Sequence, residues 1–222
     1  MYASNSVYPY LSETFQITRA VLLITCIITF SSALYIKDAK VKNILYIETV
    51  ITLIAGFIYS LFVLQIDQSE RFKNALDWTK ITDYRYIDWS LTTPLMLLTL
   101  CIILAKNSKT FVRTPIYLTI AALNYIMLLF GYLGEKNIME KLTATIAGFV
   151  SFFIMFYLIY VKFVAPRFSK FNYMLFGIYA VFWSLYGIVY LLGEEQKTLY
   201  TNVLDMITKG FVGLSIWAYC VR

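Results

Sequence analysis

The segment ITDYRYIDWSLTTPLMLLTL, residues 81 to 100, places an arginine and an aspartate near the beginning of a strongly apolar run. The run is apolar enough to form a membrane-spanning helix. An ionisable side chain at membrane depth is costly unless it is paired, and such residues commonly mark functional sites. Arg85 and Asp88 therefore predict a buried cluster of charges, and the rest of the chain must supply its other members.

The composition indicates an integral membrane protein. The 222 residues are 60% hydrophobic and 14% charged, with a mean hydropathy of +0.69, whereas soluble domains average about 25% charged residues. Apolar runs of about 20 residues, long enough to span a bilayer, lie near 17–36, 43–65, 86–105, 114–134, 142–164, 172–193 and 200–221. We therefore expect an all-α membrane protein, a seven-transmembrane-helix bundle that forms a single domain over residues 1–222 without an output module.

The distribution of lysine and arginine predicts the orientation of the bundle. If the N-terminus lies outside, seven basic residues fall in the outer segments and ten in the cytoplasmic ones, namely Lys37, Lys40, Lys42, Lys106, Lys109, Arg113, Lys162, Arg167, Lys170 and Arg222. The positive-inside rule then places the N-terminus outside and the C-terminus in the cytoplasm. The first segment, MYASNSVYPYLSETFQ, has no basic start, so we expect it to be mature and ordered outside rather than a cleaved signal peptide.

Several classes of function are disfavoured by what the sequence lacks. It contains no histidine, which is the commonest metal ligand and the commonest general base. The three cysteines lie in apolar runs without CxxC spacing, and the nine glycines form no phosphate-binding loop. The net charge of +6 reflects the excess of lysine and arginine on the predicted cytoplasmic side. No basic patch is interleaved with aromatic residues, as a nucleic-acid-binding surface would require. We therefore expect no metal site, no enzymatic activity and no nucleic-acid partner.

Five ionisable side chains remain at membrane depth: Glu48, Arg85, Asp88, Asp205 and Lys209. Lys209 lies in the middle of the seventh apolar run, too deep for its amine to reach the bilayer surface easily. One interpretation is a structural ion pair between the third and seventh helices. The other is a Schiff-base lysine, whose protonated imine keeps its charge beside the Asp88 and Asp205 carboxylates. Arg85 would then balance the second negative charge.

A Schiff base requires an aldehyde ligand, and neighbouring side chains suggest the shape of its binding site. Residues Trp89, Thr92, Thr93 and Met96 follow Asp88 in the third helix, and in the sixth helix one face carries Trp183, Tyr186 and Tyr190. An aromatic stripe by itself is more often core packing. Together with a buried lysine, the stripe predicts a tunnel for a long polyene.

These segments resemble the microbial (type 1) rhodopsins, in particular the bacteriorhodopsin-like ones. RYIDWSLTTPLMLL is similar to the counterion segment of that family, and LDMITKGFVG is similar to its retinal-lysine segment. LIAGFIYS in the second helix matches pocket positions at Ala55 and Tyr59, and NYIMLLFG in the fourth sets Asn124, Met127 and Gly131 where the family lines the ring end of retinal. The short loops and the acid in the second helix resemble the compact rhodopsins of large viruses.

The resemblance implies a role for each charged residue of the cluster. Lys209 would bind all-trans retinal through a Schiff base, Asp88 would be the primary counterion and proton acceptor, and Asp205 would be the second counterion. Two positions depart from the family pattern. Gly187 stands where the sixth helix usually has proline, which would weaken or alter the kink, and Gly148 replaces a pocket tryptophan, which would leave the ring end less tightly packed.

The resemblance favours a light-driven outward proton pump. Such pumps carry a carboxylic acid at the position of Thr99, eleven residues after Asp88, and here that acid is missing. Glu48 of the second helix is the predicted replacement, because a desolvated carboxyl at this depth would be protonated and could return a proton to the Schiff base. The alternative is that Glu48 snorkels to the cytoplasmic face. Thr92 lies one turn beyond Asp88 in the same series.

Two other functions within the family stay open. A light-gated ion channel generally carries several acids along its second helix, where this chain has Ala55 at the Schiff-base level and only Glu48 beyond it. A sensory photoreceptor would need a separate membrane transducer. Asp88 argues against the chloride pumps, and the pair of Asp88 and Thr92 departs from the sodium pumps, so protons are the expected transported species.

Further expectations concern proton release and assembly. Glu195, in the loop after the sixth helix, matches one member of the release pair of the family, whereas Lys197 stands at the other position. The resemblance also implies a homo-oligomer, either a trimer or a pentamer, in a plasma membrane or host cell membrane. Its partners would be retinal, protons and the lipid bilayer.

Overall fold

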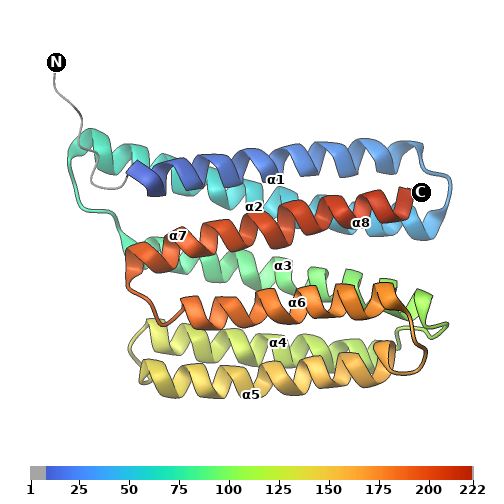
Figure 1. The fold of residues 1–222 in the computed structure, drawn as a ribbon. Helices are drawn as coiled ribbons and strands as arrows, with labels where there is room; N and C mark the ends of the chain where they lie inside the picture. Colours follow the sequence, from blue (N-terminus) through green and yellow to red (C-terminus); the bar gives the residue numbers. More distant parts are fainter. Residues whose placement is uncertain (1–8, 222) are drawn as a thin grey trace. The chain divides into compact units, whose positions relative to one another are not determined.

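The computed structural model describes residues 9–221, which form helices joined by short connections (Figure 1). Within this range, 7 helical segments are long and apolar enough to cross a membrane. The elements are α1 (Pro9–Tyr35), α2 (Ala39–Phe72), α3 (Trp78–Asn107), α4 (Thr114–Glu135), α5 (Lys141–Ile159) with η1 (Tyr160–Val164), α6 (Lys170–Val189), and α7 (Glu194–Asp205) with η2 (Met206–Phe211) and α8 (Val212–Val221). The predicted seven-helix fold is confirmed. Of the N-terminal segment that we expected to be ordered, residues 9–16 form the start of α1, and residues 1–8 lie outside the described residues.

Several helices extend beyond the apolar runs that predict them. α2 continues through polar residues as far as Phe72, and α3 likewise starts before its apolar run. A helix propagates through backbone hydrogen bonds, so polar turns can continue it past the apolar region. Local caps fix both ends of α2: the Asp38 side chain accepts hydrogen bonds from the backbone of Lys40 and Val41, and Lys73 adopts a left-handed φ of 53°.

The described chain packs as two compact units, and the boundary between them falls inside α3, directly after Asp88. The first unit comprises residues 9–88 and 192–221. In it α1 packs along α2, and the seventh span packs against α1, with η2 and α8 also against α2. The rings of Phe15, Tyr59 and Phe62 join α1 to α2, with centroids between 5.2 and 6.1 Å apart. The expectation of a single domain stays a prediction.

The second unit comprises residues 89–191 and contains the remainder of α3 with α4, α5, η1 and α6. α4 packs along α5, and α6 packs against α5 and η1. Four phenylalanines of α5 form a ring cluster with neighbouring centroids 4.6 to 5.8 Å apart: Phe149, Phe152, Phe153 and Phe156. Aromatic packing thus joins the buried rings of Phe152 and Phe156 to rings nearer the surface of this unit.

A buried asparagine ties three elements of the second unit together. Asn172, at the start of α6, is fully buried, and its Nδ2 donates hydrogen bonds to the Leu104 carbonyl and to Ser108 Oγ, both at 2.9 Å. Its Oδ1 accepts a hydrogen bond from Asn107 Nδ2 at 2.9 Å. Ser108 Oγ in turn donates to the Phe163 carbonyl of η1 at 2.6 Å. The network therefore links the end of α3 to η1 and α6.

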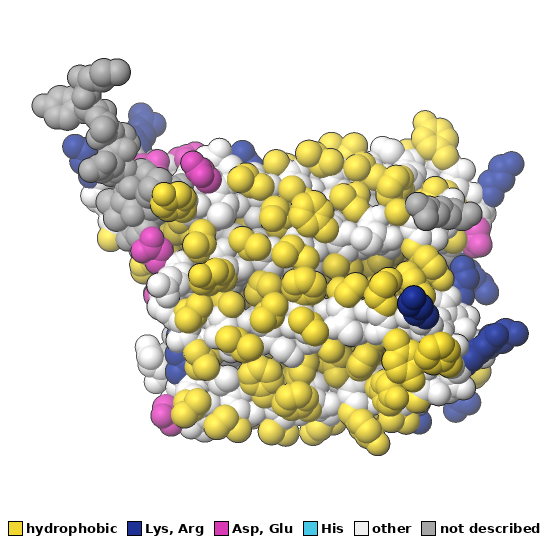
Figure 2. All heavy atoms as spheres, in the orientation of Figure 1, with side chains coloured by type: hydrophobic (Ala, Val, Ile, Leu, Met, Phe, Trp, Pro, Cys, Tyr) yellow, Lys and Arg dark blue, Asp and Glu magenta, His cyan; other side chains and the backbone are white. Residues whose placement is uncertain are grey.

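The surfaces of the helices are those of a protein embedded in lipid. On the face that Figure 2 shows, hydrophobic side chains cover the middle of the helices, and charged side chains gather near the helix ends. Large apolar residues such as Phe57, Leu118 and Phe153 are more than half exposed, at 62%, 59% and 63%. Such exposure would favour aggregation in water and is expected in a bilayer. The chain is an integral, multi-pass membrane protein.

We predict that Asn172→Ala lowers the free energy of unfolding by about 1–3 kcal/mol, because buried donors and acceptors around it lose their partner. Thermal denaturation of the purified protein would measure this as a lower Tm. The control is Asn43→Ala, since Asn43 of α2 is exposed and should tolerate the change. Equal Tm values for the two variants would contradict the structural role of Asn172.

Candidate functional site

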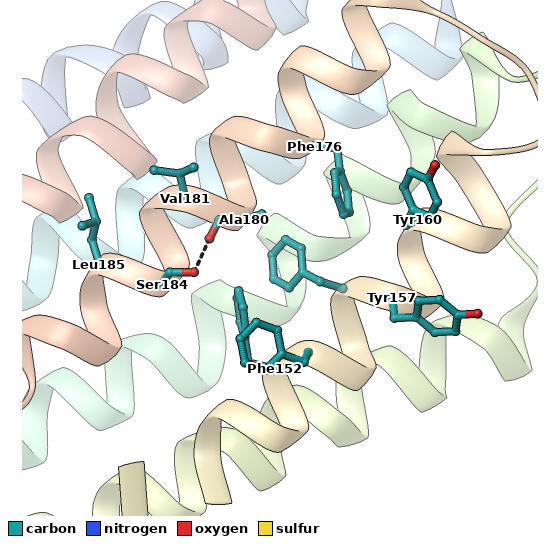
Figure 3. Close-up of a pocket in the computed structure, with 10 residues that line it drawn as sticks. Phe152, Tyr157, Tyr160, Phe176, Ala180, Val181, Ser184 and Leu185 are labelled. Carbon is teal, nitrogen blue, oxygen red and sulfur yellow. Dashed lines mark hydrogen bonds between the residues drawn. The ribbon is translucent and has the colours of Figure 1, made fainter. Parts of the chain in front are cut away.

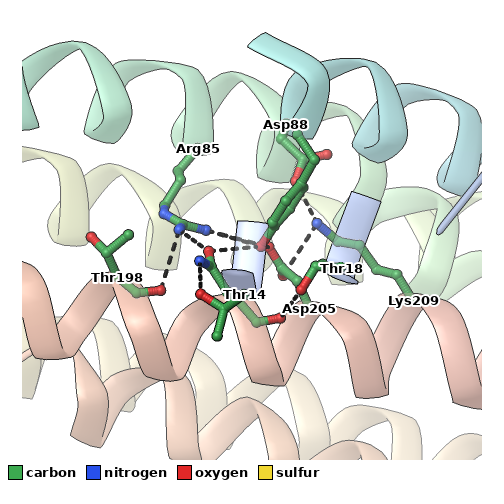
Figure 4. Close-up of polar contacts among 9 residues, drawn as sticks. Thr14, Thr18, Arg85, Asp88, Thr198, Asp205 and Lys209 are labelled. Atoms are coloured by element: carbon green, nitrogen blue, oxygen red, sulfur yellow. Dashed lines mark hydrogen bonds and ion pairs between the residues drawn. The ribbon is translucent and has the colours of Figure 1, made fainter. Parts of the chain in front are cut away.

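Lys209 lies in a π-helical stretch of the seventh span, η2, between α7 and α8. π-Helical segments are rare and frequently occur at functional sites. The Lys209 side chain is buried, and its Nζ forms ion pairs with Asp88 of α3 and with Asp205, where Oδ1 is 3.3 Å away (Figure 4). The structure therefore brings the lysine and both predicted carboxylates together within the first unit.

Asp205 has partners besides the lysine. Its Oδ2 accepts a hydrogen bond from Tyr59 Oη at 2.8 Å and lies 3.5 Å from Arg85 Nη1. Asp88, Asp205, Arg85 and Lys209 are all at most 6% exposed. Two cations thus face two anions, and charge balance of this kind is what makes buried ions tolerable in an apolar interior.

Arg85 is enclosed by aromatic rings and by acceptors from α7. Its guanidinium carbon lies 5.1 Å from the centroid of the Phe62 ring and 5.8 Å from that of Tyr59, within the range of cation–π attraction. Its Nη2 donates hydrogen bonds to Asn202 Oδ1 at 2.5 Å and to the Thr198 carbonyl at 3.4 Å (Figure 4). The position of the guanidinium is therefore fixed from several sides.

Asn202 is the principal site residue that the sequence analysis missed. Its side chain is fully buried, and its Oδ1 accepts hydrogen bonds from Arg85 and from Tyr59 Oη, the latter at 3.2 Å. Its Nδ2 donates to Thr14 Oγ1 of α1 at 2.9 Å. Asn202 precedes Asp205 by three residues, so the two side chains share a face of α7. A buried amide one turn from a predicted counterion was the available signal.

Glu48 lies in the interior of the first unit. It is 3% exposed in α2, and a Cβ atom added to Gly213 of α8 would lie 3.1 Å from Glu48 Oε2. Gly213 follows Lys209 by four residues, about one helical turn. The Glu48 carboxyl is therefore buried in the first unit, and its role as a proton donor stays a prediction.

Glu195 lies apart from the buried charges. It is exposed in the first turn of α7, and the neighbouring ion pair is formed by Lys197 Nζ and Glu194 Oε1, at 2.8 Å. Arg85 contacts the same helix about one turn later, at the Thr198 carbonyl. A role for Glu195 in proton release stays a prediction.

In the second unit, the retinal-lining residues predicted in the third and fourth helices share a hydrogen-bond network. Thr93 Oγ1 donates to the Trp89 carbonyl at 2.6 Å and accepts a hydrogen bond from Asn124 Nδ2 at 2.8 Å. Thr92, at 0% exposed, and Met96, at 3%, are buried in the same helix. The side chains of α3 and α4 are therefore held in place by local contacts.

The aromatic residues predicted in the sixth helix pack within the second unit. Trp183 is buried and stacks on Tyr179, with ring centroids 5.2 Å apart and an interplanar angle of 17°. Tyr186 meets the Trp89 ring edge to face at 5.7 Å. Three of these rings were predicted, and Tyr179 was not, although it precedes Trp183 by four residues on the same face.

Tyr190 lies just after the last residue of α6. Its hydroxyl group donates a hydrogen bond to the Gly131 carbonyl of α4 at 3.0 Å. A Cβ atom at Gly134 would lie 2.1 Å from this hydroxyl oxygen, so glycine is required there. Burial raises the pKa of the Tyr190 phenol, and the Glu135 carboxylate raises it further. Tyr190 is thus anchored to α4.

The two departures from the family pattern have distinct surroundings. A Cβ atom at Gly187 would lie 2.6 Å from Phe149 Cζ, so the glycine lets this ring of α5 pack directly on α6. A Cβ atom at Gly148 would find the Met127 carbonyl oxygen at 3.7 Å, an ordinary contact that leaves room for a larger residue. Figure 3 shows an apolar groove between α5 and α6 that aromatic side chains such as Phe152 line.

The residues present fit a cofactor with an aldehyde group. A lysine amine condenses with a carbonyl group to form an imine, and Lys209 supplies such an amine beside two carboxylates that can stabilise a positively charged nitrogen. The second unit, taken by itself, has an apolar groove lined by aromatic side chains such as Phe152 and Phe156. Among residues 9–221, no group of His, Cys, Asp or Glu is suited to hold a metal ion.

Comparison with known proteins identifies relatives. Residues 11–222 match the family described as bacteriorhodopsin-like protein. The solved structure of viral rhodopsin OLPVRII is 34% identical, with a TM-score of 0.85, and the match covers 94% of this chain and 96% of that one. The green-light absorbing proteorhodopsin of Gamma-proteobacterium EBAC31A08 is 31% identical over 158 residues, which cover 64% of this chain and 62% of the proteorhodopsin. The aligned part is less than two thirds of that relative.

A more distant structure agrees on the fold. The proton pumping rhodopsin AR2 from the marine alga Acetabularia acetabulum is 21% identical, with a TM-score of 0.77, and the match covers 94% of this chain and 93% of that one. At this identity the likeness concerns the fold alone. The predicted resemblance to microbial rhodopsins, including the viral ones, is confirmed by the family match and by the viral structure.

We predict that Asn202→Ala lowers the free energy of unfolding by about 1.5–3 kcal/mol, the range for a hydrogen bond to a charged group, because Arg85 loses an acceptor. The matched control is Thr198→Ala, since Arg85 contacts Thr198 through its backbone carbonyl, which this variant keeps. Thermal denaturation should show a clearly larger loss of Tm for Asn202→Ala. Equal losses would mean that packing of α7, and not the amide, sets the effect.

Proposed function

The chain belongs to the bacteriorhodopsin-like family of microbial rhodopsins, and we propose that within this family it is a light-driven outward proton pump. One observation carries the proposal: Lys209 Nζ lies between two buried carboxylates, and a third buried carboxyl, that of Glu48, lies against the helical turn that follows Lys209. A pump needs an acceptor and a separate donor for the same proton. This arrangement offers both.

Retinal, the chromophore that the family implies, would be held through Lys209 Nζ. When bound, retinal supplies the absorption of light and a light-dependent fall in the proton affinity of the Lys209 nitrogen. The task of the protein is then to accept that proton on one group and to return another from a different group.

Asp88 is the proposed acceptor of the proton that leaves the Lys209 nitrogen. Both carboxylates form ion pairs with Lys209 Nζ, but Asp205 also accepts a hydrogen bond from Tyr59 and faces Arg85 at 3.5 Å. A hydrogen-bond donor and a cation stabilise a carboxylate and oppose its protonation. Asp205 is therefore the proposed lasting counterion, and Asp88, which the resemblance to the family matches to the acceptor position, is the proposed acceptor.

Glu48 is the proposed donor that returns a proton to the Lys209 nitrogen. It is buried in α2, and the Thr52 hydroxyl donates a hydrogen bond to its backbone carbonyl at 2.8 Å. A buried carboxyl group carries its proton more readily than an exposed one, because burial penalises the charged form. Thr99, at the position where outward pumps of the family carry their acid, leaves this task open to Glu48.

The surroundings of Glu48 favour the pump over a light-gated channel. Threonine hydroxyls nearby are bonded to carbonyls of their own helices: Thr25 to Val21, Thr29 to Thr25, Thr49 to Leu45 and Thr52 to Glu48. Hydroxyl groups that are already bonded contribute less to a hydrated ion path than groups that face water. The sensory alternative is separated from the pump by experiment.

We predict that illumination acidifies the medium of cells that express the protein and are supplied with retinal, and that a protonophore abolishes the change. Asp88→Asn, which removes the proposed acceptor, is the inactive control and should give no pH change. Coloured cells without any light-induced pH change would contradict the pump. Voltage-clamped membranes would then separate a channel, whose current reverses with the ion gradient, from a sensor, which gives none.

We also predict that Glu48→Gln slows the recovery of the visible absorbance after a flash by about a hundredfold, because a positioned acid typically contributes 10²–10⁴-fold to a proton transfer. Azide, a small weak acid, should restore the rate by carrying the proton itself. The matched control is Glu70→Gln, since Glu70 is exposed near the end of α2. Unchanged recovery in Glu48→Gln would refute the donor role.

A further inference from the structure

Gly213 of α8 faces the Glu48 carboxyl group. A Cβ atom built on Gly213 would lie 3.1 Å from Glu48 Oε2 and 3.5 Å from Thr25 Cγ2. The first distance is tighter than an ordinary van der Waals contact. The space that a side chain at Gly213 would take is therefore bordered by a carboxylate oxygen of α2 and a methyl group of α1.

This surrounding distinguishes Gly213 from other helical glycines of the chain. At Gly210, one turn earlier, the nearest atom to an added Cβ is Val21 Cγ1, at 2.6 Å, so that glycine serves close packing of α1 on η2. At Gly177 of α6, no heavy atom lies within 4 Å. Gly213 instead borders a titratable group that the proposed function uses.

The Thr25 border of this space is held in place by a hydrogen bond. Thr25 Oγ1 donates to the Val21 carbonyl at 2.8 Å, which orients the Thr25 side chain. Its methyl group is the one that approaches Gly213. The Glu48 carboxyl and the Thr25 methyl group thus both border the space that a side chain at Gly213 would take.

We propose that Gly213 is a positioning residue, whose missing side chain lets the Glu48 carboxyl lie against α8 about one turn beyond Lys209 and so sets the rate at which Glu48 returns its proton. The inference rests on the proposed donor role of Glu48. An added methyl group must displace the carboxyl by a few tenths of an ångström. Misplacement by 1 Å can cost about 10²-fold in rate, so such a displacement corresponds to roughly a two- to tenfold loss.

The test uses Gly213→Ala in the full-length, retinal-bound protein, with Gly177→Ala as the matched control. Gly213→Ala should slow the recovery of the visible absorbance after a flash roughly two- to tenfold, and azide should remove the difference. Gly177→Ala should recover like the wild type. Alanine is the better helix former, so neither variant should lower the Tm of the protein prepared without retinal, and a slower recovery then does not reflect a damaged fold.

A spectroscopic readout reports on Glu48 directly. The carboxyl C=O stretch that Glu48→Gln removes from the infrared difference spectrum should shift in Gly213→Ala and stay in place in Gly177→Ala. A second variant, Thr25→Ser, removes the bordering methyl group and keeps the hydroxyl that bonds to Val21. It should broaden the same band, and it tests the site even where Gly213→Ala does not fold.

The outcomes separate the two proposals. If Glu48→Gln slows recovery but Gly213→Ala and Thr25→Ser change neither the rate nor the band, the positioning role is wrong and the donor role stands. If Glu48→Gln itself recovers at the wild-type rate, the donor role is wrong and the positioning role falls with it. A slower, azide-sensitive recovery together with a shifted band in Gly213→Ala supports both.

Discussion

The burial of one positive charge, that of Lys209, is the constraint on which the remaining charged residues depend. A buried ammonium group without partners would be strongly destabilising, so Asp88 and Asp205 accompany it. Two carboxylates overcompensate a single cation, and Arg85 restores neutrality at 3.5 Å from Asp205. Arg85 in turn needs acceptors, which Asn202 and the Thr198 carbonyl provide. Each buried charge of the cluster thus requires the polar partner that lies next to it.

The seventh span is divided into three pieces that serve this cluster differently. α7 contributes the amide and the carbonyl that fix Arg85, and it ends at Asp205. The π-helix η2 carries Lys209. Although wider than an α-helix, η2 keeps Lys209 Nζ within 3.3 Å of Asp205 Oδ1. α8 then begins with Val212 and Gly213, where the absence of a side chain admits the carboxyl of α2.

Sequence patterns predict the fold and the charged core of the site for a clear physical reason. Apolar runs predict the membrane-spanning segments, because a segment within lipid must be a continuous helix. Ionisable residues at membrane depth are easy to recognise, because burying a charge there costs free energy and such residues are rare. The same reasoning could not find the π-helix η2, since a one-residue change in hydrogen-bond register has no composition signal. Nor could it find Gly213. The proposed role of this glycine depends on the Glu48 carboxyl of another helix lying next to it, and the sequence of α8 alone does not show that contact. Asn202 could have been named as a candidate, because it is a polar residue one turn from Asp205. Its hydrogen bond with Arg85 depends on how the helices pack, which the sequence does not show.

The two sides of Lys209 along the seventh span differ in the side chains that surround them. On the α7 side, Arg85 is held by the neutral Asn202 amide, by Tyr59 and by the Phe62 ring, none of which changes its charge in the proposed cycle. Arg85 in turn lies 3.5 Å from the Asp205 carboxylate. On the α8 side, the nearest acid that the proposal uses is Glu48, whose carboxyl borders a space without a side chain. A cation held by neutral groups on one side and the proposed proton donor on the other make the two sides unequal, and the proposed pump depends on such an inequality.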